Sequence, residues 1–232
     1  MESMRCGECR DIARLIDHTL LKPDAVEMDI LKVCEEAVRF DFASVCTASC
    51  WTALVTEKLY CTGGRVKVCS VVGFPFGSAL TAAKAKEASA AVESGAEEID
   101  MVINVGYLRS GKYEAFEKDL CDVVSACRNA TVKVIIEACY LNDEQIVLAA
   151  KAIRRAGAAF IKTSTGYGPA GAKLEDVRLI RNTVPDIQIK ASGGVRTYKQ
   201  AMMFIEAGAS RIGTSSGPAI MSEAHYDRSP GI

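Results

Sequence analysis

Eight short runs rich in β-branched residues recur along the chain about 28 residues apart, and amphipathic stretches with helical spacing separate them. This is the period of a βα unit, and strands that alternate with helices indicate a parallel sheet covered by helices. Eight such units predict a single (β/α)8 TIM barrel, to which an open doubly wound sheet is the alternative. The expected strands are Leu15 to Asp17, Ala43 to Thr47, Val66 to Phe74, Glu98 to Asn104, Val132 to Cys139, Phe160 to Thr165, Ile187 to Ser192 and Arg211 to Ser215.

The chain reads as one domain over residues 1–232, because no Gly/Ser/Pro-rich linker divides it. We expect a short N-terminal extension and a disordered tail over residues 222–232. The start MESMRCGECR lacks an apolar stretch of signal-peptide length, and no segment has 18 uninterrupted apolar residues, so a cytoplasmic, reduced protein is expected.

Charge excludes several classes of partner. The 28 basic and 29 acidic residues give a net charge of -1 without a long run of either sign, which argues against nucleic-acid and membrane binding. Cys6 and Cys9 have a C-x-x-C spacing without a second ligand pair, and His18 and His225 are the only histidines. We therefore expect no metal and no cofactor. Cys46, Cys69 and Cys139 lie in apolar stretches and are interpreted as small buried hydrophobic residues.

A repeated glycine gives the units a common frame. Gly95, Gly157 and Gly208 each follow an amphipathic stretch and precede the next strand, as C-terminal helix glycines do. Asp100 and Lys162 stand five residues after the first two of these glycines. Equivalent positions on parallel strands project to the same side, so both side chains should face the inside of the barrel.

Lys162 and Lys190 end neighbouring expected strands, although lysine is costly to bury. Each could form a structural ion pair with Asp100 or Glu137. Barrel enzymes, however, gather their chemistry at the carboxyl ends of the strands. Burial and a second ammonium both lower the pKa of a lysine, and the neutral amine can then form a Schiff base with an aldehyde or ketone.

Imine chemistry also needs a group that moves protons. Asp100 is a carboxylate within an apolar strand and is the first candidate, and its interpretation as a counter-ion of Lys190 is compatible with this role. Asp17 and Glu137 are further candidates, for which a structural polar role is the alternative.

Glycine-rich segments follow the last three expected strands: Thr165 to Gly168, Ser192 to Thr197 and Gly213 to Gly217. Glycines let backbone N–H groups approach a phosphate, and a helix that begins nearby adds its positive dipole end. Each segment alone could be a tight turn, but three at one rim indicate a phosphate site.

Seven motifs spread over residues 11–221 together resemble the deoxyribose-phosphate aldolases: IDHTLL (16–21), GFPFG (73–77), EIDMVINVG (98–106), KVIIEACYL (133–141), FIKTSTGYG (160–168), KASGGVRT (190–197) and RIGTSSG (211–217). The resemblance implies a class I aldolase on a (β/α)8 barrel. Such an enzyme reversibly cleaves 2-deoxy-D-ribose 5-phosphate to acetaldehyde and D-glyceraldehyde 3-phosphate.

The resemblance also implies a role for individual residues. Lys162 would form the Schiff base, with Asp100 as the proton relay and Lys190 as the group that lowers its pKa, while Asp17 would hydrogen-bond the sugar. The phosphate would be held by Gly166, Gly193, Gly194, Ser215 and Ser216. The chain departs from the family pattern at Cys46-Thr47-Ala48-Ser49, where V-N-P usually follows the cysteine, and at Phe76 and Ala138.

Two other functions use parts of the same pattern. A phosphosugar isomerase or epimerase without a covalent intermediate would share the phosphate loops but gain nothing from paired lysines. A sugar-phosphate-binding protein without catalysis would not need Asp100, Lys162 and Lys190 together. The expected partners are phosphorylated sugars and aldehydes, and a homo-oligomer, a dimer or tetramer, is expected because most soluble oligomers are homo-oligomers.

Overall fold

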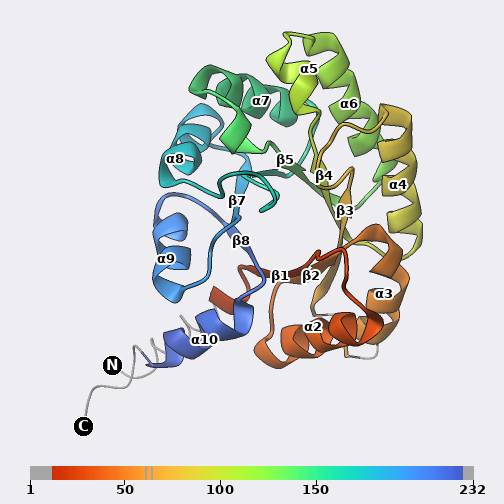
Figure 1. Cartoon of the computed structure of the whole chain (residues 1–232), viewed down its shortest axis with the longest axis vertical. Coiled ribbons are helices and arrows are strands. Elements are labelled where there is room, and N and C mark those ends of the chain that lie inside the picture. Colours follow the sequence, from red (N-terminus) through yellow and green to blue (C-terminus); the bar gives the residue numbers. More distant parts are fainter. Residues whose placement is uncertain (1–11, 61, 64, 227–232) are drawn as a thin grey trace.

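The computed structural model describes residues 12–60, 62–63 and 65–226, and it forms a closed ring of strands surrounded by helices (Figure 1). The strands are β1 (Ile16–Leu20), β2 (Ser44–Thr47), β3 (Lys67–Val72), β4 (Glu98–Val102), β5 (Thr131–Ile135), β6 (Phe160–Lys162), β7 (Gln188–Ser192) and β8 (Arg211–Thr214). The helices are α2 (Glu27–Phe40), α3 (Thr52–Tyr60), α4 (Thr81–Glu93), α5 (Val105–Arg109), α6 (Tyr113–Ala126), α7 (Asp143–Arg155), α8 (Leu174–Thr183), α9 (Tyr198–Glu206) and α10 (Gly217–Tyr226). Two 3-10 turns, η1 (Ser49–Trp51) and η2 (Ala138–Tyr140), follow β2 and β5.

All eight strands pair in parallel with their sequence neighbours, and β8 closes on β1. The predicted (β/α)8 barrel is confirmed, and the open doubly wound sheet is excluded. Several strands end earlier than predicted. The sixth was expected to reach Thr165 but ends at Lys162, and the Thr165 N–H donates to Glu137 Oε1 (3.1 Å) rather than to a neighbouring strand.

The helices pack on the ring through apolar stripes. In α2 the buried residues Ile30, Val33, Cys34 and Ala37 follow helical spacing, and acidic side chains occupy the first turn and Arg39 the last, as the helix dipole favours. Burying a Val or Ile side chain contributes about 1.5–3 kcal/mol, so the stripes hold the helical shell on the barrel. None of the helices in the described residues is long and apolar enough to cross a membrane.

The prediction of a disordered tail over residues 222–232 is wrong for its first part. Residues 222–226 belong to α10, whose Ala224 is fully buried. Glu223 Oε2 accepts a hydrogen bond from the backbone N–H of Tyr198 (2.8 Å), which anchors this end of α10 to the start of α9. The extension at 1–11, with Cys6 and Cys9, and residues 227–232 lie outside the described residues.

Candidate active site

One polar cluster fills the inside of the barrel, and each of the eight strands contributes to it. Its members face one another through the parallel register, in which Lys162 pairs with Lys190, Asp100 with Lys133 and Cys46 with Cys69. We call these nine residues the lumen cluster: Asp17, Cys46, Cys69, Glu98, Asp100, Lys133, Lys162, Lys190 and Arg211. All of them are buried except Arg211, whose side chain is 16% exposed.

Asp100 lies at the centre of the lumen cluster. Its Oδ2 is 2.8 Å from Lys162 Nζ and 2.7 Å from Lys190 Nζ, and its Oδ1 is 2.8 Å from Lys133 Nζ. Burial alone would raise the pKa of the Asp100 carboxyl, but the surrounding ammonium groups hold it well below its usual range. Asp100 is therefore a carboxylate shared by three amines.

The predicted meeting of Asp100 and Lys162 inside the barrel is confirmed, as is the pairing of Asp100 with Lys190. The alternative partner, Glu137, forms no ion pair with Lys162 or Lys190. Both of its carboxylate oxygens instead accept hydrogen bonds from Thr165, one from the backbone N–H and one from the hydroxyl. Glu137 thus holds the loop that follows Lys162.

Lys133, Glu98 and Arg211 are members of the lumen cluster that sequence reasoning missed. Lys133 Nζ lies 2.6 Å from Glu98 Oε2, and Arg211 Nη2 lies 3.3 Å from Glu98 Oε1. A signal for Lys133 existed. Asp100 and Lys162 each stand five residues after a glycine whose backbone is left-handed. Lys133 also stands five residues after a residue with a left-handed backbone, but that residue is Arg128 (φ 53°) rather than a glycine.

Asp17 lies deep in the lumen cluster. Its Oδ2 is 2.5 Å from Lys190 Nζ, and its Oδ1 accepts hydrogen bonds from Ser44 Oγ and Arg211 Nη1, both at 2.6 Å. Burial opposes the charged form, but these cations hold the pKa of the Asp17 carboxyl far below its usual range. Its predicted contact with a sugar stays a prediction, because its carboxylate faces Lys190 and Arg211.

The fixed charges of the lumen cluster do not balance if every group is ionised. Asp17, Glu98 and Asp100 supply three negative charges, whereas Lys133, Lys162, Lys190 and Arg211 supply four positive ones. Burial disfavours the ammonium forms of Lys133 and Lys190, but their carboxylate neighbours raise the pKa of both above the usual range. Neutrality is reached when one amine of the cluster loses its proton.

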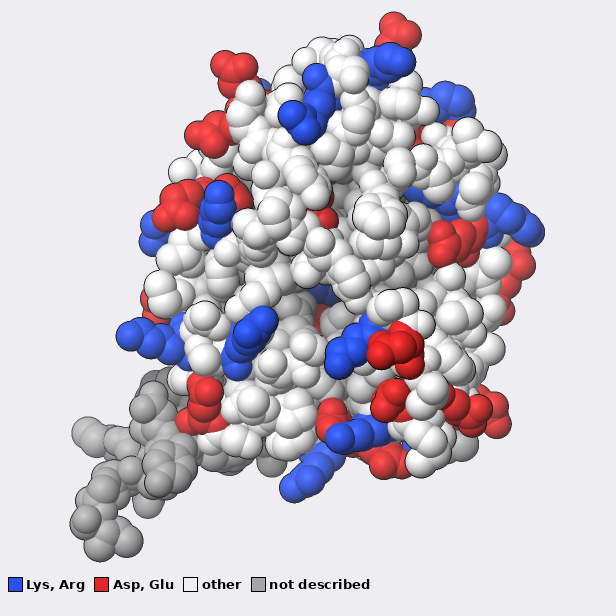
Figure 2. Space-filling model, in the orientation of Figure 1, with Lys and Arg blue, Asp and Glu red and all other residues white. Residues whose placement is uncertain are grey.

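Lys162 is the lysine of the lumen cluster that reaches a pocket. In the described part of the chain, a pocket of about 230 Å³ is lined by Lys162 and by the loops after β1, β6, β7 and β8, whereas Lys133 and Lys190 are not among its lining residues. Figure 2 shows the corresponding face with a hollow at its centre and charged atoms within it. Among the three lysines of the lumen cluster, only Lys162 thus borders the space that a ligand could occupy.

Four of the predicted phosphate residues line this pocket: Gly166, Gly193, Gly194 and Ser215. Gly166, Gly193 and Gly194 have φ between 83° and 87°, a left-handed backbone that favours glycine. At Gly193 a Cβ atom would also come within 3.0 Å of Gly171 Cα. Ser216 is not among the lining residues, and its N–H donates to Thr214 Oγ1 (2.9 Å) at the start of α10.

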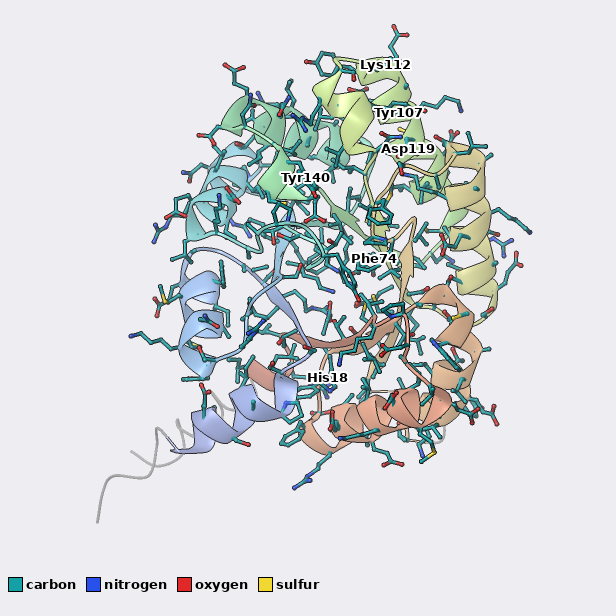
Figure 3. The ribbon with its side chains drawn as sticks, viewed as in Figure 1. His18, Phe74, Tyr107, Lys112, Asp119 and Tyr140 are labelled. Carbon is teal, nitrogen blue, oxygen red and sulfur yellow. The ribbon has the colours of Figure 1, made fainter. Side chains whose placement is uncertain are left out.

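Tyr167 forms one wall of the pocket. Its hydroxyl donates to Leu21 O (2.7 Å), and its ring meets that of Phe74 edge-on at 5.3 Å between centroids. Figure 3 shows Phe74 near the centre of the barrel. Phe76, at a position where the chain departs from the family pattern, is 79% exposed and lines a neighbouring pocket of about 270 Å³ with Tyr140 and Arg109.

The interpretation of Cys46 and Cys69 as merely small hydrophobic residues needs correction, and Cys139 is half-buried rather than buried. The Cys69 thiol donates to Asp100 Oδ1 (3.2 Å) and accepts from Lys133 Nζ (3.3 Å). Cys46, Cys69 and Asp100 bring possible metal ligand atoms within 4.8 Å of one another. Three ammonium groups already surround this carboxylate, however, so the donor set opposes the entry of a metal cation.

Comparisons with known proteins agree with this site. The model of the DeoC/LacD family aldolases matches residues 12–223. The deoxyribose-phosphate aldolase of Methanocella arvoryzae is 68% identical over 96% of this chain and 99% of its own length, and that of Thermococcus gammatolerans is 50% identical over 92% and 96%. The tetrameric deoxyribose phosphate aldolase structure from Aeropyrum pernix superposes with a TM-score of 0.87, at 35% identity over 94% of this chain and 93% of that one. The chain therefore belongs to the DeoC/LacD family of aldolases.

Proposed function

We propose that this protein reversibly cleaves 2-deoxy-D-ribose 5-phosphate to acetaldehyde and D-glyceraldehyde 3-phosphate through a Schiff base on Lys162. As a member of an aldolase family it is a carbon–carbon lyase. The observation that carries the proposal is the placement of Lys162. Its amine lies between the central carboxylate Asp100 and a pocket with glycine-rich loops at its rim.

The neutral Nζ of Lys162 adds to C1 of the open-chain sugar, and the carbinolamine loses water to give a protonated imine. The iminium withdraws electrons, so the C2–C3 bond breaks when the C3 hydroxyl loses its proton. D-Glyceraldehyde 3-phosphate leaves and an enamine remains on Lys162. Protonation of the enamine at its terminal carbon and hydrolysis by the returned water release acetaldehyde and restore the amine.

Asp100 and Lys190 support these steps. Asp100 lies 2.8 Å from Lys162 Nζ, so it can take up and return the protons of imine formation, directly or through a water. Lys190 stays an ammonium because Asp100 and Asp17 raise its pKa against the effect of burial. Its positive charge disfavours a second ammonium at Lys162. The phosphate binds at Gly166, Gly193, Gly194 and Ser215, which line the pocket, whereas the Ser216 N–H is already donated to Thr214.

Two measurements test the function. A coupled assay should detect glyceraldehyde 3-phosphate from 2-deoxyribose 5-phosphate, and borohydride with acetaldehyde should add mass to the peptide that contains Lys162. An isomerase or epimerase would release no triose phosphate and trap no adduct, and a binding protein would show binding without turnover. Membership of an aldolase family argues against both alternatives. An active preparation with unlabelled Lys162 would contradict the mechanism.

We expect Gly193→Ala to raise KM for the phosphorylated sugar about tenfold, with a smaller change in kcat. The added Cβ would approach Gly171 Cα at 3.0 Å in a backbone with φ 87°, so the amide groups of the loop must move. Gly157→Ala is the matched control, since Gly157 has a similar φ of 82° but open space around it and lies before β6, outside the pocket. Steady-state kinetics with 2-deoxyribose 5-phosphate distinguish the two. Equal effects would mean that backbone strain alone, not phosphate binding, is measured.

We also propose that the enzyme works as a homo-oligomer in the cytoplasm. The Aeropyrum pernix relative is described as tetrameric, which supports self-association. Light scattering on the purified chain tests this, and a mass of one 24.9 kDa chain would contradict it.

A further inference from the structure

Glu98 and Arg211 lie at the end of the lumen cluster away from the pocket, and we call them the floor pair. Arg211 Nη1 lies 3.4 Å from Glu98 Oε2, and Arg211 Nη2 lies 3.3 Å from Glu98 Oε1. The guanidinium also lies 5.4 Å from the centroid of the Phe160 ring, two residues before Lys162 on β6. Neither member lines the pocket, so the floor pair cannot touch a substrate there.

Unbroken chains of ion pairs nevertheless connect the floor pair to Lys162. From Arg211 the chain runs through Asp17 (2.6 Å), Lys190 (2.5 Å) and Asp100 (2.7 Å) to Lys162. From Glu98 it runs through Lys133 (2.6 Å) and Asp100 (2.8 Å) to Lys162. Every group in these two chains is buried except Arg211, whose side chain is 16% exposed, so solvent screens the charges beyond Arg211 little.

Lys162 contacts Asp100 directly and shares the inside of the barrel with titratable groups from all the other strands. They are Asp17 on β1, Cys46 on β2, Cys69 on β3, Glu98 and Asp100 on β4, Lys133 on β5, Lys190 on β7 and Arg211 on β8. The two thiols are neutral donors when they hydrogen-bond Asp100. With Lys162 uncharged, the remaining three cations balance the three carboxylates.

We propose that Glu98 and Arg211 are positioning residues for catalysis, because their charges set the balance that keeps Lys162 a neutral amine. This inference rests on the proposed Schiff-base function of Lys162. The floor pair acts through the field of its charges, without touching the reacting atoms.

The two members should act in opposite directions. Arg211→Met removes a positive charge, so an ammonium at Lys162 would restore neutrality, and a higher pH is needed to free the amine. Glu98→Gln removes a negative charge, so an ammonium at Lys162 becomes less favourable and the amine is free at lower pH. The double variant loses both charges and returns to the balance of the original protein.

The variants leave no member of the lumen cluster without a partner. In Arg211→Met, Asp17 keeps Lys190 and Ser44, and the methionine can pack on Phe160. In Glu98→Gln, Lys133 keeps Asp100. Arg211→Lys is the matched control because it keeps the charge but not the guanidinium. Thermal unfolding of each variant identifies any that does not fold.

The experiment measures kcat/KM for 2-deoxyribose 5-phosphate against pH, together with the rate of cyanoborohydride trapping of acetaldehyde on Lys162. A unit charge about 8–10 Å away, at an effective dielectric constant of about 20, shifts a titration by about one pH unit. The acid limb is the part of each pH profile in which the rate rises as Lys162 loses its proton. We expect the acid limbs of kcat/KM and of the trapping rate to move to higher pH by about one unit in Arg211→Met and to lower pH by about one unit in Glu98→Gln. They should move little in Arg211→Lys and in the double variant.

Two results in folded variants would overturn the inference. The acid limbs of Arg211→Met and Glu98→Gln could shift in the same direction, or the rates could fall while the acid limbs stay in place. Either result would make the floor pair a structural feature only. If a single variant fails to fold, the pH profile of the double variant is compared with that of Arg211→Lys. We expect the acid limb of the double variant to stay in place, and a shifted acid limb would contradict the charge balance. Failure of the proposed function is distinguishable, since the original protein itself would then trap no acetaldehyde on Lys162.

Discussion

Lys162→Ala should lower kcat/KM for 2-deoxyribose 5-phosphate by about 10⁴-fold or more, because the variant has no amine to form the imine. The fold should persist. Asp100 keeps Lys133 and Lys190 as partners, and Lys162 borders the pocket, so water can fill the space that the side chain leaves. Binding of a phosphate ester should survive, since the proposed phosphate site lies in the glycine-rich loops after β6, β7 and β8.

Steady-state turnover by the coupled assay and calorimetric titration with a non-reacting phosphate ester measure these two outcomes. Lys151→Ala is the control, because Lys151 is an exposed lysine on α7 and outside the pocket. Loss of both turnover and phosphate binding would show that the lysine also holds the phosphate. Turnover close to that of the original protein would exclude Lys162 as the Schiff-base residue.

The barrel could be predicted from the sequence because its units are local and repeated. Runs such as VKVIIEAC are apolar throughout, as strands covered on both faces must be, and their spacing leaves room for one helix each. The ends of the strands were less predictable. The segment after β6 is held by Glu137, a side chain that follows β5, and such contacts between units leave no periodic trace in the sequence.

The centre of the site was predictable for a different reason. Asp100 and Lys162 stand at the same distance after a glycine that ends a helix, so local geometry placed both inside the barrel. The glycine spacing did not predict Lys133, because the residue five positions before it is Arg128, which adopts the left-handed backbone without being a glycine. Arg211 begins its strand, where a lysine or arginine usually reaches solvent, and only the closure of β8 on β1 brings it to Asp17.

Asp100→Asn should have the second large effect, a loss of about 10²- to 10⁴-fold in kcat/KM, because the amide cannot take up protons from the imine steps. Three ammonium groups also lose their shared carboxylate, and breaking a buried ion pair costs about 3–5 kcal/mol of stability. Lower activity could therefore reflect either lost chemistry or a weakened fold, and a control must separate them.

Asp119→Asn supplies that control. Asp119 is a buried carboxylate on α6, drawn in Figure 3 on the outside of the barrel, and its Oδ2 lies 2.5 Å from the buried Lys84 Nζ of α4. Its loss should lower stability by a similar amount but leave kcat/KM within about twofold at a temperature where the variant stays folded. Denaturant unfolding and kinetics on both variants decide the question. If Asp100→Asn and Asp119→Asn both lose turnover in proportion to their lost stability, Asp100 is a structural counter-ion. If only Asp100→Asn loses turnover, the Asp100 carboxylate takes part in the chemistry.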